Sequence, residues 1–134
     1  MITDRKLHTE VDLDRAGRKS LAAVFRMFDL WGITEKQKMV LLGMSKSTYF
    51  KAKGDPEGTR ITPDLLERLS YLLNIHMAAR TLFNNPENIY GFVRQPNNNG
   101  VFNGKSPLEY MGSGSVAALY EASRHMDGLR GGGW

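Results

Sequence analysis

The stretch that decides the predicted fold is TEKQKMVLLGMSKSTYFKAKG, residues 34–54. Thr34 followed three residues later by Gln37 has the form of a capping box, in which each side chain satisfies a backbone amide left free in the first helical turn. Gly43 ends that helix after about two turns, because glycine takes the left-handed conformation without a steric cost. Ser45 then offers the N-cap of a second helix. Two short helices joined by a glycine turn predict a helix-turn-helix.

The second helix of this hairpin has an inner and an outer face. Tyr49 and Ala52 recur on one side and are predicted to face inward. From Lys36 to Lys53 there are five lysines and no acidic residue, so the outer side can neutralise phosphates while small hydroxyls reach base edges. The alternative is a solvated helical hairpin in an all-α domain. The residues predicted to contact DNA are Lys36, Ser45, Lys46, Ser47, Phe50, Lys51 and Lys53.

Composition limits the classes of protein open to the chain. Its 134 residues suit one domain of ordinary size or two very small ones that share a core. Without cysteine there is no disulfide and no thiolate metal site, and the three histidines are too scattered to predict a metal site. No apolar run approaches the roughly 18 residues of a membrane span, and the N-terminus lacks a signal-peptide core. We therefore expect a cytoplasmic protein without a metal or a cofactor.

The net charge of +4 is concentrated in one part of the chain. Residues 34–60 carry six basic and three acidic side chains, residues 1–33 carry six and five, and residues 61–134 carry six of each. Most of the excess positive charge therefore lies on the helical hairpin. The neutral C-terminal half suits contact with protein better than contact with nucleic acid.

The N-terminal half as a whole predicts helices around one apolar centre. Residues 1–13 show no clear period and are expected to form a mobile arm, whereas residues 14–30 have the spacing of an amphipathic helix. Thr62 followed by Pro63 starts a further helix, which we expect to end at Asn74 and to be followed by a short one over residues 75–83. The apolar positions expected to face inward are Leu21, Val24, Phe25 and Phe28 in the first helix and Leu65, Leu69, Leu72 and Leu73 in the later one.

The C-terminal half predicts three more short helices. Asn85-Pro86 is a cap followed by proline, which indicates a helix over residues 87–94. SPLE at 106–109 is a second capping box with proline at the first helical position. Ser115 caps the last helix, and Gly128 is expected to end it.

The residues after position 90 carry a resemblance to a known family. We find a likeness to the toxin-binding C-terminal domain of the Xre/MbcA/ParS antitoxins in the run VFNGKSPLEYMGSGSVAALYEASRHMDGLRGGGW, which YGFVRQPN precedes. The family pattern is an aromatic-rich helix ending near Pro-Asn, then Phe-Gly-Gly-basic-Ser, Leu-acidic-x-Met, and an Arg-Gly-Gly-Trp end. The chain departs from it with Asn103 where glycine is usual, Phe92 near a common tryptophan, and an extra glycine before Trp134. The matching residues are Pro96, Asn97, Phe102, Gly104, Lys105, Ser106, Leu108, Glu109, Met111, Arg130, Gly131, Gly132 and Trp134.

This resemblance, which covers about residues 20–134, implies both a fold and a function. It implies a repressor-like helix-turn-helix domain over residues 14–83 and a small helical toxin-binding domain with a glycine-rich tail over residues 84–134. Such antitoxins neutralise a RES-domain toxin that consumes or transfers from NAD, and they repress their own promoter. The protein is then expected to be a type II antitoxin that binds operator double-stranded DNA as a homodimer. The residues implied to contact the toxin are Phe102, Lys105, Arg130, Gly131, Gly132 and Trp134.

Two other classes of protein compete with this interpretation. An enzyme is disfavoured because the serines stand at helix caps, and because GSGS at 112–115 and GGG at 131–133 lack the lysine and the strand–loop–helix context of a phosphate-binding loop. A stand-alone repressor whose C-terminal half only dimerises is the second alternative.

Overall fold

The structure of the protein is a computed structural model that describes residues 4–131, of which residues 4–13 are described by their backbone alone. The described residues form seven α-helices and three 3-10 turns without a strand, which confirms the all-α prediction. The 3-10 turns lie at Pro56–Gly58, Phe92–Arg94 and Gly100–Phe102. The α-helices are α1 (Asp4–Trp31), α2 (Glu35–Leu42), α3 (Lys46–Gly54), α4 (Pro63–Leu82), α5 (Pro86–Gly91), α6 (Pro107–Met111) and α7 (Val116–Gly131).

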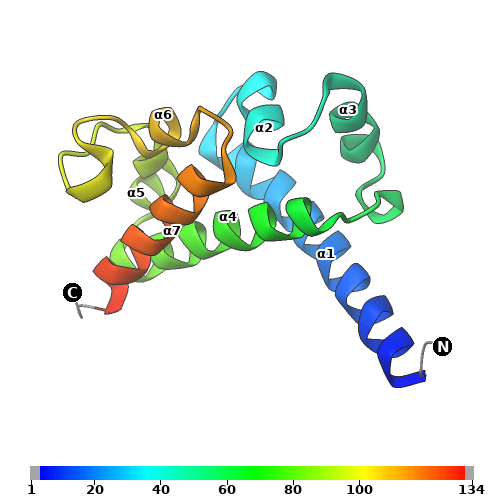
Figure 1. Ribbon diagram of the computed structural model, residues 1–134. Helices are drawn as coiled ribbons and strands as arrows, with labels where there is room; N and C mark the ends of the chain where they lie inside the picture. Colours follow the sequence, from blue (N-terminus) through cyan, green and yellow to red (C-terminus); the bar gives the residue numbers. More distant parts are fainter. Residues whose placement is uncertain (1–3, 132–134) are drawn as a thin grey trace.

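Helix α4 runs through the middle of the molecule and contacts elements from both halves of the chain (Figure 1). α7 packs along it, and α1 and α2 contact it from the other half. α3 lies at one end and α5 and α6 lie toward the other, with α2 between α3 and α6, and the first turns of α1 project beyond the rest (Figure 1). The arrangement leaves α3 at the periphery of the molecule.

One apolar core joins the two halves of the chain. It extends from Leu21 on α1 to Met126 on α7, with Trp31 and Phe28 among its largest fully buried side chains. The apolar positions expected to face inward on α1 and α4 are buried, except that Phe25 and Leu73 are half-buried. The helical segments therefore share their hydrophobic stabilisation rather than form two separate cores.

Two segment boundaries expected from the sequence are wrong. α1 begins at Asp4 instead of near residue 14, so residues 4–13 belong to a helix and not to an arm outside it. No glycine or proline precedes Gly17 in this stretch, so nothing in it breaks the helix. α4 continues through Asn74 to Leu82 as one helix, and the side-chain amide of Asn74 caps no helix end but donates a hydrogen bond to Ser123 Oγ on α7 (2.8 Å).

The C-terminal half follows its local signals, with one further correction. The helix expected over residues 87–94 is present as α5 followed by a 3-10 turn. Ser115 caps α7 by accepting a hydrogen bond from the Ala118 amide, but α7 passes Gly128 and ends at Gly131. A glycine inside a helix costs only about 1 kcal/mol relative to alanine, so it does not by itself end one.

The backbone conformation of Asn103 accounts for the asparagine at a position where the family that the chain resembles usually has glycine. Its φ and ψ are 48° and 49°, in the left-handed region. Glycine is usual at this position of the family, and asparagine is the side-chain-bearing residue that tolerates this conformation best. Asn103 therefore takes up the left-handed conformation in the loop that leads into Ser106 and α6 without a glycine.

Candidate nucleic-acid interface and partner surface

The hairpin of α2 and α3 is built by the capping chemistry that the sequence predicted. The Thr34 amide donates to Gln37 Oε1 (2.8 Å), and the Gln37 amide donates to Thr34 Oγ1 (3.1 Å). Gly43 closes α2 with a φ of 65°, and Ser45 caps α3 by accepting from the Thr48 amide. These four residues fix where both helices begin and how the chain turns between them.

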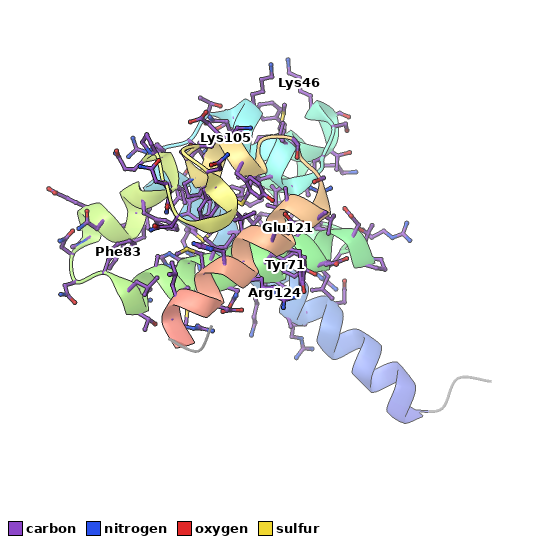
Figure 2. The ribbon with its side chains drawn as sticks, turned by 60° about the vertical axis from the view of Figure 1, so that its left-hand side comes forward. Lys46, Tyr71, Phe83, Lys105, Glu121 and Arg124 are labelled. Carbon is purple, nitrogen blue, oxygen red and sulfur yellow. The ribbon has the colours of Figure 1, made fainter. Side chains whose placement is uncertain are left out.

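Helix α3 presents one exposed face. Tyr49 and Ala52 are its buried residues, as expected. Phe50 is 45% exposed and meets the Tyr49 ring edge-on, with ring centroids 5.1 Å apart. Figure 2 shows Lys46 pointing outward at the end of the molecule formed by α2 and α3. We call the exposed residues Ser45, Lys46, Ser47, Phe50 and Lys51 the α3 outer face.

The five lysines of this region do not share one role. Lys38 is only 5% exposed, and its ammonium group donates to Asp29 (2.8 Å) and Glu35 (3.2 Å). Lys53 pairs with both carboxylate oxygens of Glu35 at 3.1 Å. The three lysines that are exposed and form no ion pair with the side chains described are Lys36, Lys46 and Lys51. The predicted DNA contact Lys53 is thus partly neutralised, whereas those three are available to phosphates.

Glu35 is the counter-charge that sequence reasoning missed. It stands one residue before the acid-free stretch, and its Oε2 accepts a hydrogen bond from the Tyr49 hydroxyl at 2.6 Å. That hydrogen bond, together with those from Lys53 and Lys38, outweighs burial and lowers the pKa of Glu35 to about 2. Burial and the Glu35 carboxylate raise the pKa of the Tyr49 hydroxyl. Glu35 is therefore ionised, and Tyr49 protonated, at neutral pH.

The residues implied to contact the toxin lie in the core, at the surface or outside the described residues. Phe102 is 1% exposed and packs edge-on against the rings of Tyr110 and His125, so it is a core residue. Lys105 is exposed, and Arg130 is exposed and pairs with Asp127 at 2.9 Å. Gly131 is the exposed last residue of α7. Gly132 and Trp134 lie outside the described residues.

Two surface features of the C-terminal half were not predicted. A groove of about 430 Å³ lies between the end of α4, α5 and α7, and the rings of Phe83 and Phe92 line it with centroids 5.8 Å apart. On another side, Tyr71 of α4 meets Tyr120 of α7, whose hydroxyl accepts from Arg124 at 3.1 Å. Figure 2 shows Tyr71 and Arg124 on this side of the molecule. Both features combine residues from helices that are far apart in the sequence, so no local sequence pattern predicts them.

Two kinds of feature are absent from the described part of the chain. Among the residues described, no three histidine, cysteine, aspartate or glutamate side chains gather as a metal site would need. None of the helices described is long and apolar enough to cross a membrane.

Comparison with known proteins gives two family matches and one relative. Residues 12–74 match the family model of the antitoxin Xre-like helix-turn-helix domain, and residues 78–132 match that of the antitoxin Xre/MbcA/ParS C-terminal toxin-binding domain. The chain is 37% identical over 113 residues to the uncharacterized protein y4oB of Sinorhizobium fredii (strain NBRC 101917 / NGR234), with 84% of each chain covered. No solved structure matches the chain. The first matched region ends and the second begins within α4, with residues 75–77 between them.

Proposed function

The chain belongs to the Xre/MbcA/ParS family of antitoxins, and from that premise we propose that it neutralises a RES-domain, NAD-consuming toxin and represses its own promoter. It carries the family's helix-turn-helix domain and toxin-binding domain and is thus a type II antitoxin. We expect it to act in the cytoplasm as a homodimer, because two α3 helices that meet successive half-sites multiply weak contacts.

The observation that carries the DNA-binding part is the α3 outer face. Lys46 and Lys51 supply phosphate contacts, and Ser47 lies between them where its hydroxyl can reach a base edge. The exposed ring of Phe50 suits the methyl group of thymine. The face carries basic, hydroxyl and apolar groups and no carboxylate, as an operator-binding helix requires.

Replacing Lys46 and Lys51 together by alanine tests this part. We expect weaker binding to DNA from the protein's own promoter, and a salt dependence whose slope falls by about 0.9 for each phosphate that the variant no longer neutralises. Fluorescence anisotropy over a range of salt concentrations measures both quantities. Lys105→Ala removes an exposed lysine from the other half and should leave both unchanged. A double variant with wild-type affinity and slope would show that α3 does not meet the phosphates.

The toxin-binding part is assigned to the C-terminal half, through Lys105, Arg130 and the glycine-rich tail. α7 ends at Gly131 on the surface, and Arg130 offers a planar set of donors at that end. The indole ring of Trp134 offers a large apolar group with one hydrogen-bond donor for a dinucleotide pocket. We therefore assign to the tail the role of entering or covering the NAD pocket of the toxin.

Deleting residues 130–134 tests the tail. The deletion should release the NAD-consuming activity of the toxin or lower its affinity for the antitoxin, while promoter binding and the thermal unfolding midpoint stay unchanged. Complete inhibition by the shortened protein at an equal molar ratio would rule the idea out. Co-expression with the neighbouring reading frame separates this function from that of a stand-alone repressor, since only an antitoxin carries a stoichiometric toxin through purification.

A further inference from the structure

Glu35 is not part of the α3 outer face, but its side chain binds helix α3 at two residues. Its carboxylate accepts hydrogen bonds from Tyr49 in the middle of α3 (2.6 Å) and from Lys53 near its end (3.1 Å). The same carboxylate accepts from Lys38, which also pairs with Asp29 on α1. One acidic side chain on the first turn of α2 thus connects three helices.

Helix α3 has few other anchors to the rest of the molecule. Only Tyr49 and Ala52 of its nine residues are buried, whereas α4 buries seven side chains. The turn at Gly43 and the cap at Ser45 hold the N-terminal end of α3. The middle and C-terminal part of α3 are therefore held by the buried Tyr49 ring, by Ala52, by the 3-10 turn that follows α3 and by the Glu35 carboxylate.

We propose that Glu35 is a positioning residue for DNA recognition, which sets the orientation of α3 through Tyr49 and holds Lys53 back from phosphates. This inference rests on the proposed DNA-binding function. Base contacts carry sequence information and need closely defined side-chain positions, whereas phosphate attraction needs only charge. Glu35 therefore raises the preference for the operator and lowers the affinity for DNA of any sequence.

Glu35→Gln should change the affinity for two kinds of DNA in opposite directions. The change removes a negative charge and releases Lys53, so affinity for a random-sequence duplex should rise about two- to fivefold and its salt slope steepen by up to about 0.9. Affinity for the promoter fragment should instead fall, because the neutral amide of glutamine accepts a weaker hydrogen bond from Tyr49 and forms no ion pair with Lys53, so α3 is held less firmly. The ratio of the two affinities should then drop by about tenfold or more.

Tyr49→Phe separates orientation from charge. It removes the hydroxyl that binds Glu35 and keeps the buried ring, which packs against Phe25 and Phe50. We expect promoter affinity to fall several-fold while affinity for random-sequence DNA stays at the wild-type value. Tyr71→Phe is the matched control, since the Tyr71 hydroxyl also donates to a carboxylate, that of Glu67 (2.8 Å), but on α4. It should change neither affinity.

Both affinities are measured on the full-length protein with duplexes of equal length, after circular dichroism has established the folded fraction of each variant. A merely structural role would lower both affinities together, and a merely electrostatic role would raise both; either result for Glu35→Gln overturns the proposal. A wild-type promoter preference that both Glu35→Gln and Tyr49→Phe retain would overturn this inference alone. A wild-type protein with no promoter preference would overturn the proposed repressor function with it.

Discussion

Helices α3 and α7 serve the two halves of the molecule and are held in different ways. α3 carries Lys46, Lys51 and Lys53 without an acidic residue and buries two side chains. α7 balances two arginines with Glu121 and Asp127 and buries six residues along α4 and the core. A helix that displays its side chains to DNA cannot also bury them. α3 therefore depends on caps, a glycine turn and polar contacts, whereas α7 depends on packing.

The largest expected effect comes from removing packing on α7. Leu119 is fully buried, so Leu119→Ala should lower the free energy of unfolding by about 2–5 kcal/mol. The matched control is Leu129→Ala on the same helix, where the side chain is 44% exposed and the change should be within about 1 kcal/mol. Urea unfolding followed by circular dichroism measures both. Equal losses of stability in the two variants would contradict the packing role assigned to α7.

The next effect concerns the turn that leads into α3. Gly43→Ala places a Cβ at a φ of +65° and 2.7 Å from the Arg68 guanidinium, which donates to the Leu41 carbonyl oxygen. The left-handed conformation alone costs an alanine about 1–2 kcal/mol. Gly54→Ala, at the end of α3 with no atom within 4 Å of the added Cβ, should be neutral or slightly stabilising. The same urea unfolding assay should show a loss of stability for Gly43→Ala and none for Gly54→Ala. Equal stabilities of the two variants would contradict the role assigned to the turn.

A smaller effect compares the caps of the two helices. Ser115→Ala removes the cap of α7 and should lower the global free energy of unfolding by about 1 kcal/mol, because α7 unfolds with the core. Ser45→Ala removes the cap of α3 and should act mainly on local opening, since so little of α3 is buried. Amide hydrogen exchange should then accelerate in α3 more than in the rest of the protein. Faster exchange spread evenly over all helices would contradict this difference.

The smallest expected effect is on the dependence of stability on pH. Burial lowers the pKa of His125, and burial together with Arg80 lowers that of His76, from the ordinary value of 6.5. Below pH 6.5 the unfolded chain then binds protons that the folded protein does not, so stability falls until the folded pKa values are passed. Glu35, whose pKa is lowered to about 2, contributes stability that is present above pH 4.5 and is lost from there toward pH 2.

Urea midpoints measured from pH 7.5 downward test these two windows. His125→Leu should flatten the decline in the upper window and leave the lower one unchanged, and Glu35→Gln should do the reverse. If neither variant alters the window assigned to it, other groups account for the acid sensitivity.

Local signals were predictable from the sequence because both partners lie within one turn. Thr34 with Gln37, Ser106 with Glu109, and Ser115 form the caps that their spacing predicts. The exposed face of α3 likewise follows from its period, with Tyr49 and Ala52 inside.

The features that sequence reasoning missed depend on partners far along the chain. Asparagine is a residue type common at helix ends, so Asn74 was expected to end a helix. Its hydrogen-bond partner Ser123, which lies 49 residues away, could not be recognised from the local sequence. Glu35 meets Tyr49 and Lys53, 14 and 18 residues on, and only the fold of the chain around the Gly43 turn brings them together. Phe102 matches the family pattern, but a match does not distinguish a residue that touches a partner from a core residue.

The continuity of α4 limits how this antitoxin can be recombined with its relatives. The regions that match the two family models are separated by only residues 75–77 of α4, and the hydrogen bond from Asn74 to Ser123 joins one region to the other. A chimera joined at that point would pair the α4 surface of one parent with the α7 of another. Exchanging the halves of two relatives at this boundary thus breaks the packing between α4 and α7 on which both halves depend. A change of operator specificity or of toxin specificity should therefore arise by single substitutions on the outer surfaces. The two specificities should be inherited together as one unit.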